Sequence, residues 1–226
     1  MVTTKATQPD TGAAAPACSC SETTVGHHHH HQHVTMQGRP VHGISCKLEP
    51  AEVQQIVTAN GRTEQFDPAL TDRLADLRRE HVDHLTIFVG AGTCGLGAGA
   101  GKMLTAVKQY VAEHELDAEI IEVGCIGMCS AEPLLDIQVP GRTRLMFGKV
   151  MAKDAPKIIS NVLEDSVPQK HLIGQFRDES ADAWGGVPFV DEHPFFADQV
   201  RRVLANCGIV NPSRLDEYIA RGGYQA

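Results

Sequence analysis

The chain of 226 residues lacks several features that would assign it to a broad class. No stretch of 18 apolar residues is present, which argues against a membrane-spanning helix. The opening residues MVTTKATQPDTG lack the apolar core of a secretory signal. The net charge is −8 and there is no stripe of basic residues, which argues against nucleic-acid binding. These absences predict a cytoplasmic chain with no membrane span and no nucleic-acid partner.

Cysteine, by contrast, is well represented, with seven residues. In a chain of apparently cytosolic type, that many cysteines point to metal or redox chemistry before structural disulfides. The length allows one good hydrophobic core, or one core with ordered extensions. The search for function therefore centres on the cysteines.

Residues 1–46 are expected to be disordered, because they are rich in Ala, Thr, Ser and Pro and have little to bury. They contain a histidine run, His27–His31, with Cys18 and Cys20 just upstream. Three interpretations stay open for this run: an expression tag, a natural low-complexity metal chelator, or a solvated tail with no role. It does not enter the prediction of the fold.

Residues 47–84 are predicted to form two helices, called here the helical lead, before the α/β region. The first begins near Glu49, with Pro50 at its start, and ends at Asn60-Gly61. The second follows Asp67, a suitable N-cap, and carries leucines on one face.

Residues 85–165 alternate between strand and helix patterns. Strands are expected at 85–89, 118–123, 134–139 and 142–147, and helices at 102–114 and 154–163. Pro140-Gly141 predicts a hairpin turn. The order β-α-β-β-β-α and the length of about 80 residues fit an α/β fold, a thioredoxin-like two-layer sandwich.

Residues 166–226 change in character. The range 174–188 is predicted to be an extended linker anchored by Trp184. A helix is expected over 195–207, with Gly208 as its C-cap. A last helix is expected from Asn211-Pro212-Ser213 to about Ala220.

Two predicted loops carry the cysteine chemistry. Cys94 lies between a strand and the start of a helix, and Cys125 and Cys129 form a C-x3-C pair before the hairpin. In a thioredoxin-like sheet these loops lie side by side, so the three thiols converge. Thiolates are soft ligands for iron, and a [2Fe–2S] cluster normally takes four. Glycine backbone N–H groups can bind cluster sulfurs without steric hindrance. The glycines predicted to contribute to cofactor binding are Gly92, Gly95, Gly124 and Gly127.

Other interpretations of the same residues stay open. The cysteines could be buried inert thiols, could hold zinc with a histidine, or could include a Cys125–Cys129 disulfide. A G-x-G-x-x-G match at 90–95 could indicate phosphate binding, although a lone match is weak evidence.

The motifs VGAGTCGLGAGAG and EVGCIGMCSAEPLLDI resemble one family in particular. It is the thioredoxin-like [2Fe–2S] ferredoxin domain fused to the flavin and NADH-binding subunit of NADH-linked oxidoreductases. These include relatives of complex I, bidirectional and bifurcating hydrogenases and NAD-dependent formate dehydrogenases. The tail HPFFADQVRRVLANCGIVNPSRLDEYIARGGYQA resembles the lead-in to the flavin domain of that subunit. The resemblance covers residues 85–226.

This sequence departs from the family at two points. The first loop usually has C-x4-C, and Val89 stands at the earlier position, which leaves three ligands. Cys18, Cys20, Cys46 or a histidine could supply a fourth, and Cys207 is a poorer candidate. The Gly-rich loop for FMN and NADH is also absent before the chain stops at Ala226. FMN and NAD are therefore expected on a partner chain or a missing continuation, and no catalytic centre is expected here.

The resemblance implies an electron-transfer subunit of an NAD(H)-linked oxidoreductase complex, with a flavin and NADH-binding subunit as partner. The alternative is a structural adaptor that has lost the cluster and docks subunits together. The segment 195–220 would be an interface in such a complex, or would pack within this chain.

Overall fold

The computed structural model describes residues 33–36, 39–59, 62 and 66–225. The chain divides into residues 1–30 and 31–226, and every described residue belongs to the second unit. None of the helices in the described ranges is long and apolar enough to span a membrane.

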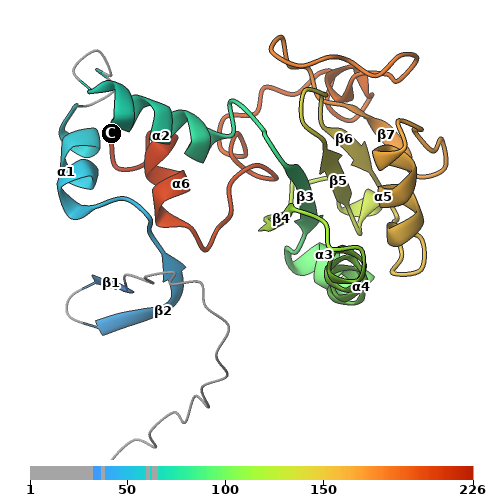
Figure 1. Ribbon diagram of the computed structural model, residues 1–226, viewed down its shortest axis with the longest axis horizontal. Helices are drawn as coiled ribbons and strands as arrows, with labels where there is room; N and C mark the ends of the chain where they lie inside the picture. Colours follow the sequence, from blue (N-terminus) through green and yellow to red (C-terminus); the bar gives the residue numbers. More distant parts are fainter. Residues whose placement is uncertain (1–32, 37–38, 60–61, 63–65, 226) are drawn as a thin grey trace, which may run out of the picture. The chain divides into compact units, whose positions relative to one another are not determined.

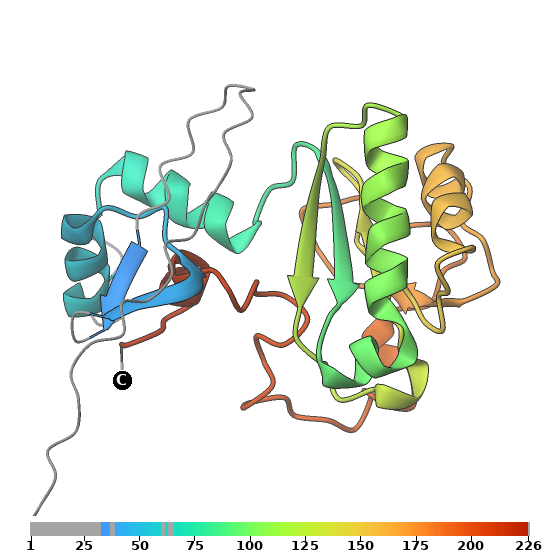
Figure 2. The same cartoon turned by 90° about the horizontal axis from the view of Figure 1, so that it is seen from below.

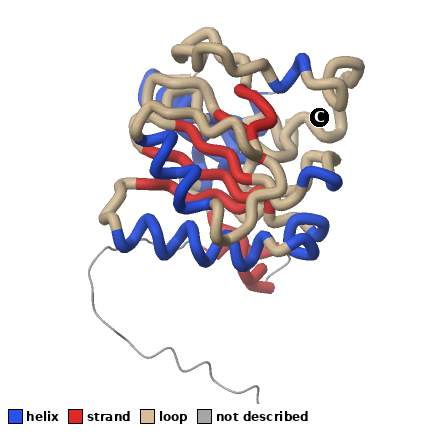
Figure 3. Tube along the Cα trace, turned by 90° about the vertical axis from the view of Figure 1, so that its right-hand side faces the viewer, coloured by secondary structure: helices blue, strands red, loops and turns tan. Residues whose placement is uncertain are grey.

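A five-stranded mixed sheet forms the centre of the described chain (Figures 1 and 3). Its order is β4-β3-β5-β6-β7, with β3 and β4 parallel and the other pairs antiparallel. The strands are β3 (Leu85–Gly90), β4 (Ala118–Val123), β5 (Leu135–Gln138), β6 (Leu145–Phe147) and β7 (Leu172–Gln175). The first four of these confirm the strands predicted from the sequence.

Two helices cover one face of this sheet, α4 (Ala100–Glu113) and α5 (Ala155–Leu163) (Figure 2). Because side chains alternate along a strand, every second residue of β3, β5 and β6 enters the core beneath these helices. Ile87, Leu135 and Phe147 are fully buried there. The thioredoxin-like two-layer α/β arrangement is therefore confirmed.

The opposite face of the sheet carries a different set of side chains, among them Phe88, Asp136 and Met146. No α-helix among the described residues packs against its part around Met146. Instead, the C-terminal chain packs there: Val190, Phe195 and Phe196 contact the cluster around Met146. This face is thus closed by irregular chain, which leaves room for a cavity.

A separate helical unit joins the two ends of the described chain. It consists of α1 (Pro50–Ala59), α2 (Pro68–Arg78) and α6 (Leu215–Ala220). Asp67 caps α2, its side chain accepting a hydrogen bond from the backbone N–H of Leu70 at 2.8 Å. Ile219 of α6 packs into a small core with residues of α1 and α2. Residues 215–220 therefore pack within this chain, one of the two alternatives weighed for 195–220.

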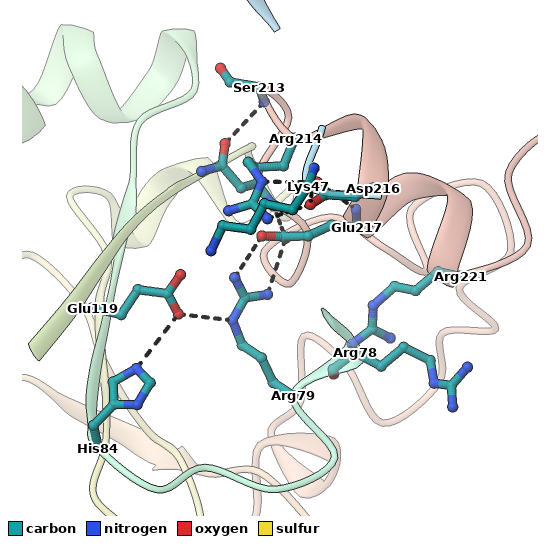
Figure 4. Close-up of polar contacts among 11 residues, drawn as sticks. Lys47, Arg78, Arg79, His84, Glu119, Ser213, Arg214, Asp216, Glu217 and Arg221 are labelled. Atoms are coloured by element: carbon teal, nitrogen blue, oxygen red, sulfur yellow. Dashed lines mark hydrogen bonds and ion pairs between the residues drawn. The ribbon is translucent and has the colours of Figure 1, made fainter. Parts of the chain in front are cut away.

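Buried ion pairs hold α6 in place (Figure 4). Arg79 donates to both carboxylate oxygens of Glu217, at 3.0 and 2.7 Å, and lies 3.5 Å from Glu119 on β4. Asp216 is fully buried, and it pairs with Arg214 and accepts the backbone N–H of Lys47 at 3.0 Å. Because these carboxylates are almost completely removed from water, each depends on its partners.

Residues 33–45 differ from the expectation of disorder over 1–46. The described residues in this range form a two-stranded antiparallel sheet of β1 (His33–Met36) and β2 (Arg39–Ser45). β-Branched residues such as Val34, Thr35, Val41 and Ile44 favour extended backbone. The histidine run, Cys18 and Cys20 lie outside the described residues.

The helix predicted over 195–207 is wrong. The chain there forms turns that are interrupted at 199–201. Arg201 donates to the carbonyl of Ile126 at 2.9 Å, and Phe195 packs beside Met146. These tertiary contacts outweigh a helix propensity that the β-branched Val200 and Val203 already weaken.

The segment 174–188, expected to be an extended linker, is in part an element of the sheet, because Gly174 and Gln175 belong to β7 and pair with β6. Trp184 is an anchor, as predicted. It is 3% exposed, its Nε1 donates to the carbonyl of Thr143 at 2.8 Å, and Arg142 stacks 3.9 Å from its ring centroid.

The Asp216 ion pair gives a pH-dependent prediction. Burial alone would raise the pKa of Asp216, but Arg214 and two backbone N–H groups outweigh it and lower this pKa. The pair therefore stabilises the fold fully above the unfolded pKa of about 3.9, and loses effect as the pH falls through the lower folded value. We expect Asp216→Asn to lower the free energy of unfolding by about 3 kcal/mol at neutral pH. Urea unfolding of wild type and variant, at pH values from neutral to acidic, measures this difference in free energy.

The difference between wild type and Asp216→Asn should shrink below a pH of about 4. Asp72→Asn removes an exposed carboxylate of α2 and is the matched control, with stability close to wild type. Equal destabilisation at every pH would contradict the account.

Candidate metal centre

The pairing of β3 with β4 brings the two cysteine loops together. The strands are parallel and in register from Leu85 opposite Ala118 to Gly90 opposite Val123, so both end at the same edge of the sheet. The backbone N–H of Ala91 continues the pairing by donating to Val123 at 2.9 Å. The chain after each strand therefore starts from adjacent points, although the loops are far apart in sequence.

Cys94, Cys125 and Cys129 meet at this edge. Their three sulfur atoms lie within 4.8 Å of one another, and no other group of three or more potential metal ligands occurs among the described residues. The sulfurs of Cys125 and Cys129 are 3.7 Å apart. Two thiolates bound at about 2.3 Å to one tetrahedral ion lie about 3.8 Å apart. The donor set and its spacing therefore fit a metal centre with thiolate ligands.

The same geometry bears on two alternatives. All three cysteines are free thiols, so Cys125 and Cys129 do not form a disulfide in this structure. Cys94 and Cys129 are exposed and Cys125 is half-buried, so the interpretation as buried inert thiols is wrong. Zinc and iron both accept thiolate ligands, so this geometry suits either metal.

The glycines near these cysteines have different surroundings. A Cβ on Gly92 would lie 2.9 Å from the backbone nitrogen of Cys125, so only glycine allows the two loops to approach this closely. Gly127 has φ +92° and its N–H donates to the sulfur of Cys125 at 3.3 Å. A Cβ on Gly95 would meet the carbonyl oxygen of Gly90 at 2.0 Å, whereas Gly124 has open space around it. A role for these four in cofactor binding stays a prediction.

The Gly-rich loop is shorter than the sequence suggested, because a helical turn interrupts it. The helix α3 (Thr93–Ala98) begins one residue before Cys94, which places this cysteine in its first turn. The backbone N–H groups of a first turn are not used within a helix, and they favour negative charge nearby.

Glu132 is a residue at this site that the sequence analysis missed. It is 7% exposed and lies against the first loop, and its Oε2 accepts the backbone N–H of Leu134 at 2.9 Å. Burial raises the pKa of Glu132, and the nearby charge of Asp136 adds to this. Its Oε1 has no hydrogen-bond partner in the described part of the chain. The sequence feature that could have pointed to Glu132 is a carboxyl group within the mostly apolar segment SAEPLL.

None of the candidates for a fourth ligand joins the three sulfurs among the described residues. Val89, at the family's usual cysteine position, is fully buried in the main core. Cys46 is buried in the core of the helical unit, with its thiol donating to Leu48. Cys207 is half-buried in the C-terminal segment. Cys18 and Cys20 are not described.

Comparisons with known proteins give one similar curated protein and similar solved structures. No model of a protein family matches the chain. The chain is 28% identical over 88 residues to the NADP-reducing hydrogenase subunit HndB of Solidesulfovibrio fructosivorans. The match covers 38% of this chain and 70% of that subunit. This similarity supports the resemblance to oxidoreductase subunits that the cysteine motifs predicted.

Two solved structures are also similar to the chain. One is a thioredoxin-like [2Fe–2S] ferredoxin from Aquifex aeolicus, with 16% identity and a TM-score of 0.36 over 42% of this chain and 96% of that one. The other is a cysteine-to-serine variant of that ferredoxin, with 16% identity and a TM-score of 0.33 over 39% of this chain and 95% of that one.

The close approach of Gly92 to Cys125 can be tested by one added methyl group. Gly92→Ala should push the second loop away and reduce metal binding at least tenfold, because thiolate ligands must meet within a few tenths of an ångström. Gly97→Ala is the matched control, since a Cβ there meets nothing within 4 Å. Iron bound per chain after anaerobic loading measures both variants. Wild-type loading of Gly92→Ala would contradict the geometry.

Proposed function

We propose that this chain is an electron-transfer subunit of an oxidoreductase complex. Cys94, Cys125 and Cys129 would hold a [2Fe–2S] cluster at the loop edge of the thioredoxin-like sheet. The observation that carries the proposal is the meeting of three thiols from two distant loops within 4.8 Å. The similarity to a hydrogenase subunit supports it.

The residues of the chain suit this role. A [2Fe–2S] cluster supplies a centre that gains and loses single electrons, with a potential set by charge, hydrogen bonds and exposure. Cys94 and Cys129 are exposed, so the centre would lie at the surface, within reach of another protein. The N–H of Gly127 donates to the sulfur of Cys125 and would stabilise negative charge on that thiolate.

The electron partner in this proposal is a flavin and NADH-binding subunit. FMN and NAD would be bound by that subunit or by a continuation of this sequence. The relative HndB is itself named as a subunit of an NADP-reducing hydrogenase, which supports a role within a larger complex.

The domain division follows the same proposal. The sequence predicts that residues 85–165 form the ferredoxin domain and 166–226 the start of the flavin-subunit sequence. Because β7 and Trp184 belong to the sheet and its core, we place them in the ferredoxin domain as well. The lead of residues 47–84 shares its small core with Ile219 and Ala220 near the other end of the chain. We propose that lead and tail act as one docking unit beside the ferredoxin domain.

A structural adaptor without a cluster is the second candidate. The observation that favours it is the lack of a fourth ligand beside the three sulfurs among the described residues. An adaptor predicts that Cys94→Ser leaves assembly and activity of the complex unchanged.

Anaerobic loading with iron and sulfide separates these functions. We expect equal amounts of iron and labile sulfide, about two of each per chain, and a brown colour. Cys94→Ser, Cys125→Ser and Cys129→Ser should each lose most of both, because each removes one of three thiolates.

Cys207→Ser is the control, since this thiol is outside the group of three, and it should load as wild type does. Zinc without sulfide would indicate a zinc site instead. A colourless chain that binds no metal would leave the adaptor as the function.

A further inference from the structure

A cavity of about 430 Å³ lies on the sheet face opposite α4 and α5, outside the group of three cysteines. Its volume is in the range of small-molecule sites, which are mainly apolar with a few fixed polar groups. The apolar part of its wall consists of Ile126, Met146, Phe176, Val190, Phe196 and Ile209. Three arginines also line it: Arg144, Arg177 and Arg201.

Arg144 is a rigidly held cation in this wall. It is 8% exposed, and its Nε donates to Asp136 at 3.0 Å while its Nη2 donates to Asp136 and to the carbonyl of Gly208. The guanidinium lies 3.5 Å from the ring centroid of Phe88 and 4.7 Å from that of Phe176. A guanidinium fixed in the wall of a cavity is a suitable contact for an anion.

Guanidinium groups outnumber carboxylates in the wall of the cavity, which includes Arg144, Arg177 and Arg201 but only one carboxylate, that of Asp191. Asp136 pairs with Arg144 from outside the lining and balances its charge. Arg177 pairs with Asp191 at 2.9 Å and with Glu192 at 3.0 Å at the exposed rim. Exposed pairs of this kind are weak and open readily to another anion. Arg201 donates to the backbone at Ile126, so its positive charge is not neutralised by a carboxylate there.

We propose that this cavity binds an organic anion with an apolar body. The body would lie among the phenylalanine and aliphatic side chains, and the anionic group would contact Arg144 and the two rim arginines. A purely apolar ligand would cover Arg201 without pairing its charge. A small inorganic anion would leave the apolar wall exposed to water.

The cavity also touches the metal centre's second loop. Ile126, between Cys125 and Cys129, is 7% exposed and forms part of the wall. A bound ligand would therefore contact the backbone that positions both cysteines. The inference does not rest on the proposed function, because binding can be measured on the chain without metal.

Three probes test the proposal on the full chain. Anilinonaphthalenesulfonate is an apolar body with an anionic group, N-phenylnaphthylamine is its neutral analogue, and inorganic phosphate is an anion without a body. Calorimetry should show one anilinonaphthalenesulfonate per chain, bound at least tenfold more tightly than the neutral analogue. Phosphate should not displace it at equal concentration.

Two variants test whether the probe binds in this cavity. Ala205→Trp fills the cavity from its lining and should abolish binding. Arg177→Gln should weaken it about tenfold, the effect of one lost charge contact. Lys153→Gln makes the same charge change at an exposed position away from the lining, and should bind as wild type does.

Alkylation of cysteines gives an independent readout. Cys207 lines the cavity, so the bound anion should slow its alkylation, whereas the rate at exposed Cys94 should not change. Equal binding of the neutral analogue, displacement by phosphate, unchanged binding in Ala205→Trp, or no protection of Cys207 would each overturn the proposal.

Discussion

The parallel pairing of β3 with β4 is the constraint on which the cysteine site depends. It makes both strands end at one edge, with Gly90 opposite Val123. The loops that follow can then approach until the position of a Cβ on Gly92 is 2.9 Å from the backbone nitrogen of Cys125. A side chain at this point would separate the loops. The thiols converge because the sheet sets the direction and the missing side chain sets the distance.

Much of this arrangement could be predicted from local patterns. The strands of residues 85–147 follow from hydrophobic periodicity and from the turn signal at Pro140-Gly141, and the starts of α1 and α2 from Pro50 and Asp67. The convergence of Cys94 with the C-x3-C pair followed from the expected topology. For the helices, strands and turn, the signal lies within a few residues of the element that it specifies.

The rest depends on contacts between distant residues. Residues 195–207 have a helical pattern, yet Arg201 and Phe195 make tertiary contacts that hold the segment as turns. Glu132 stands out in the sequence as a carboxyl group among apolar residues, but its position against the first loop could not be predicted from that. The pairing of β7 with β6 arises from the sheet edge that β6 offers. Long-range partners of this kind cannot be read from a single sequence.

One face of the sheet carries the hydrophobic core and the other carries the cavity. The loop that contains Ile126 adjoins both the cysteine site and the cavity. Under α4 and α5 the sheet is a dry core, which fixes the strands and hence the cysteines. On the other face, Asp136 and Arg144 form a buried pair beneath irregular chain, and a cavity remains. Ile126 belongs to both the cavity wall and the cysteine loop. An electron-transfer centre and a ligand site would thus share one short segment of backbone.

The most direct test of the central claim is the EPR spectrum of the chain after anaerobic loading with iron and sulfide and reduction by dithionite. A [2Fe–2S] cluster held by Cys94, Cys125 and Cys129 predicts one unpaired electron for every two irons, and loss of the signal in Cys125→Ser. A loaded chain without such a signal, or one whose signal survives in Cys125→Ser, would contradict the account.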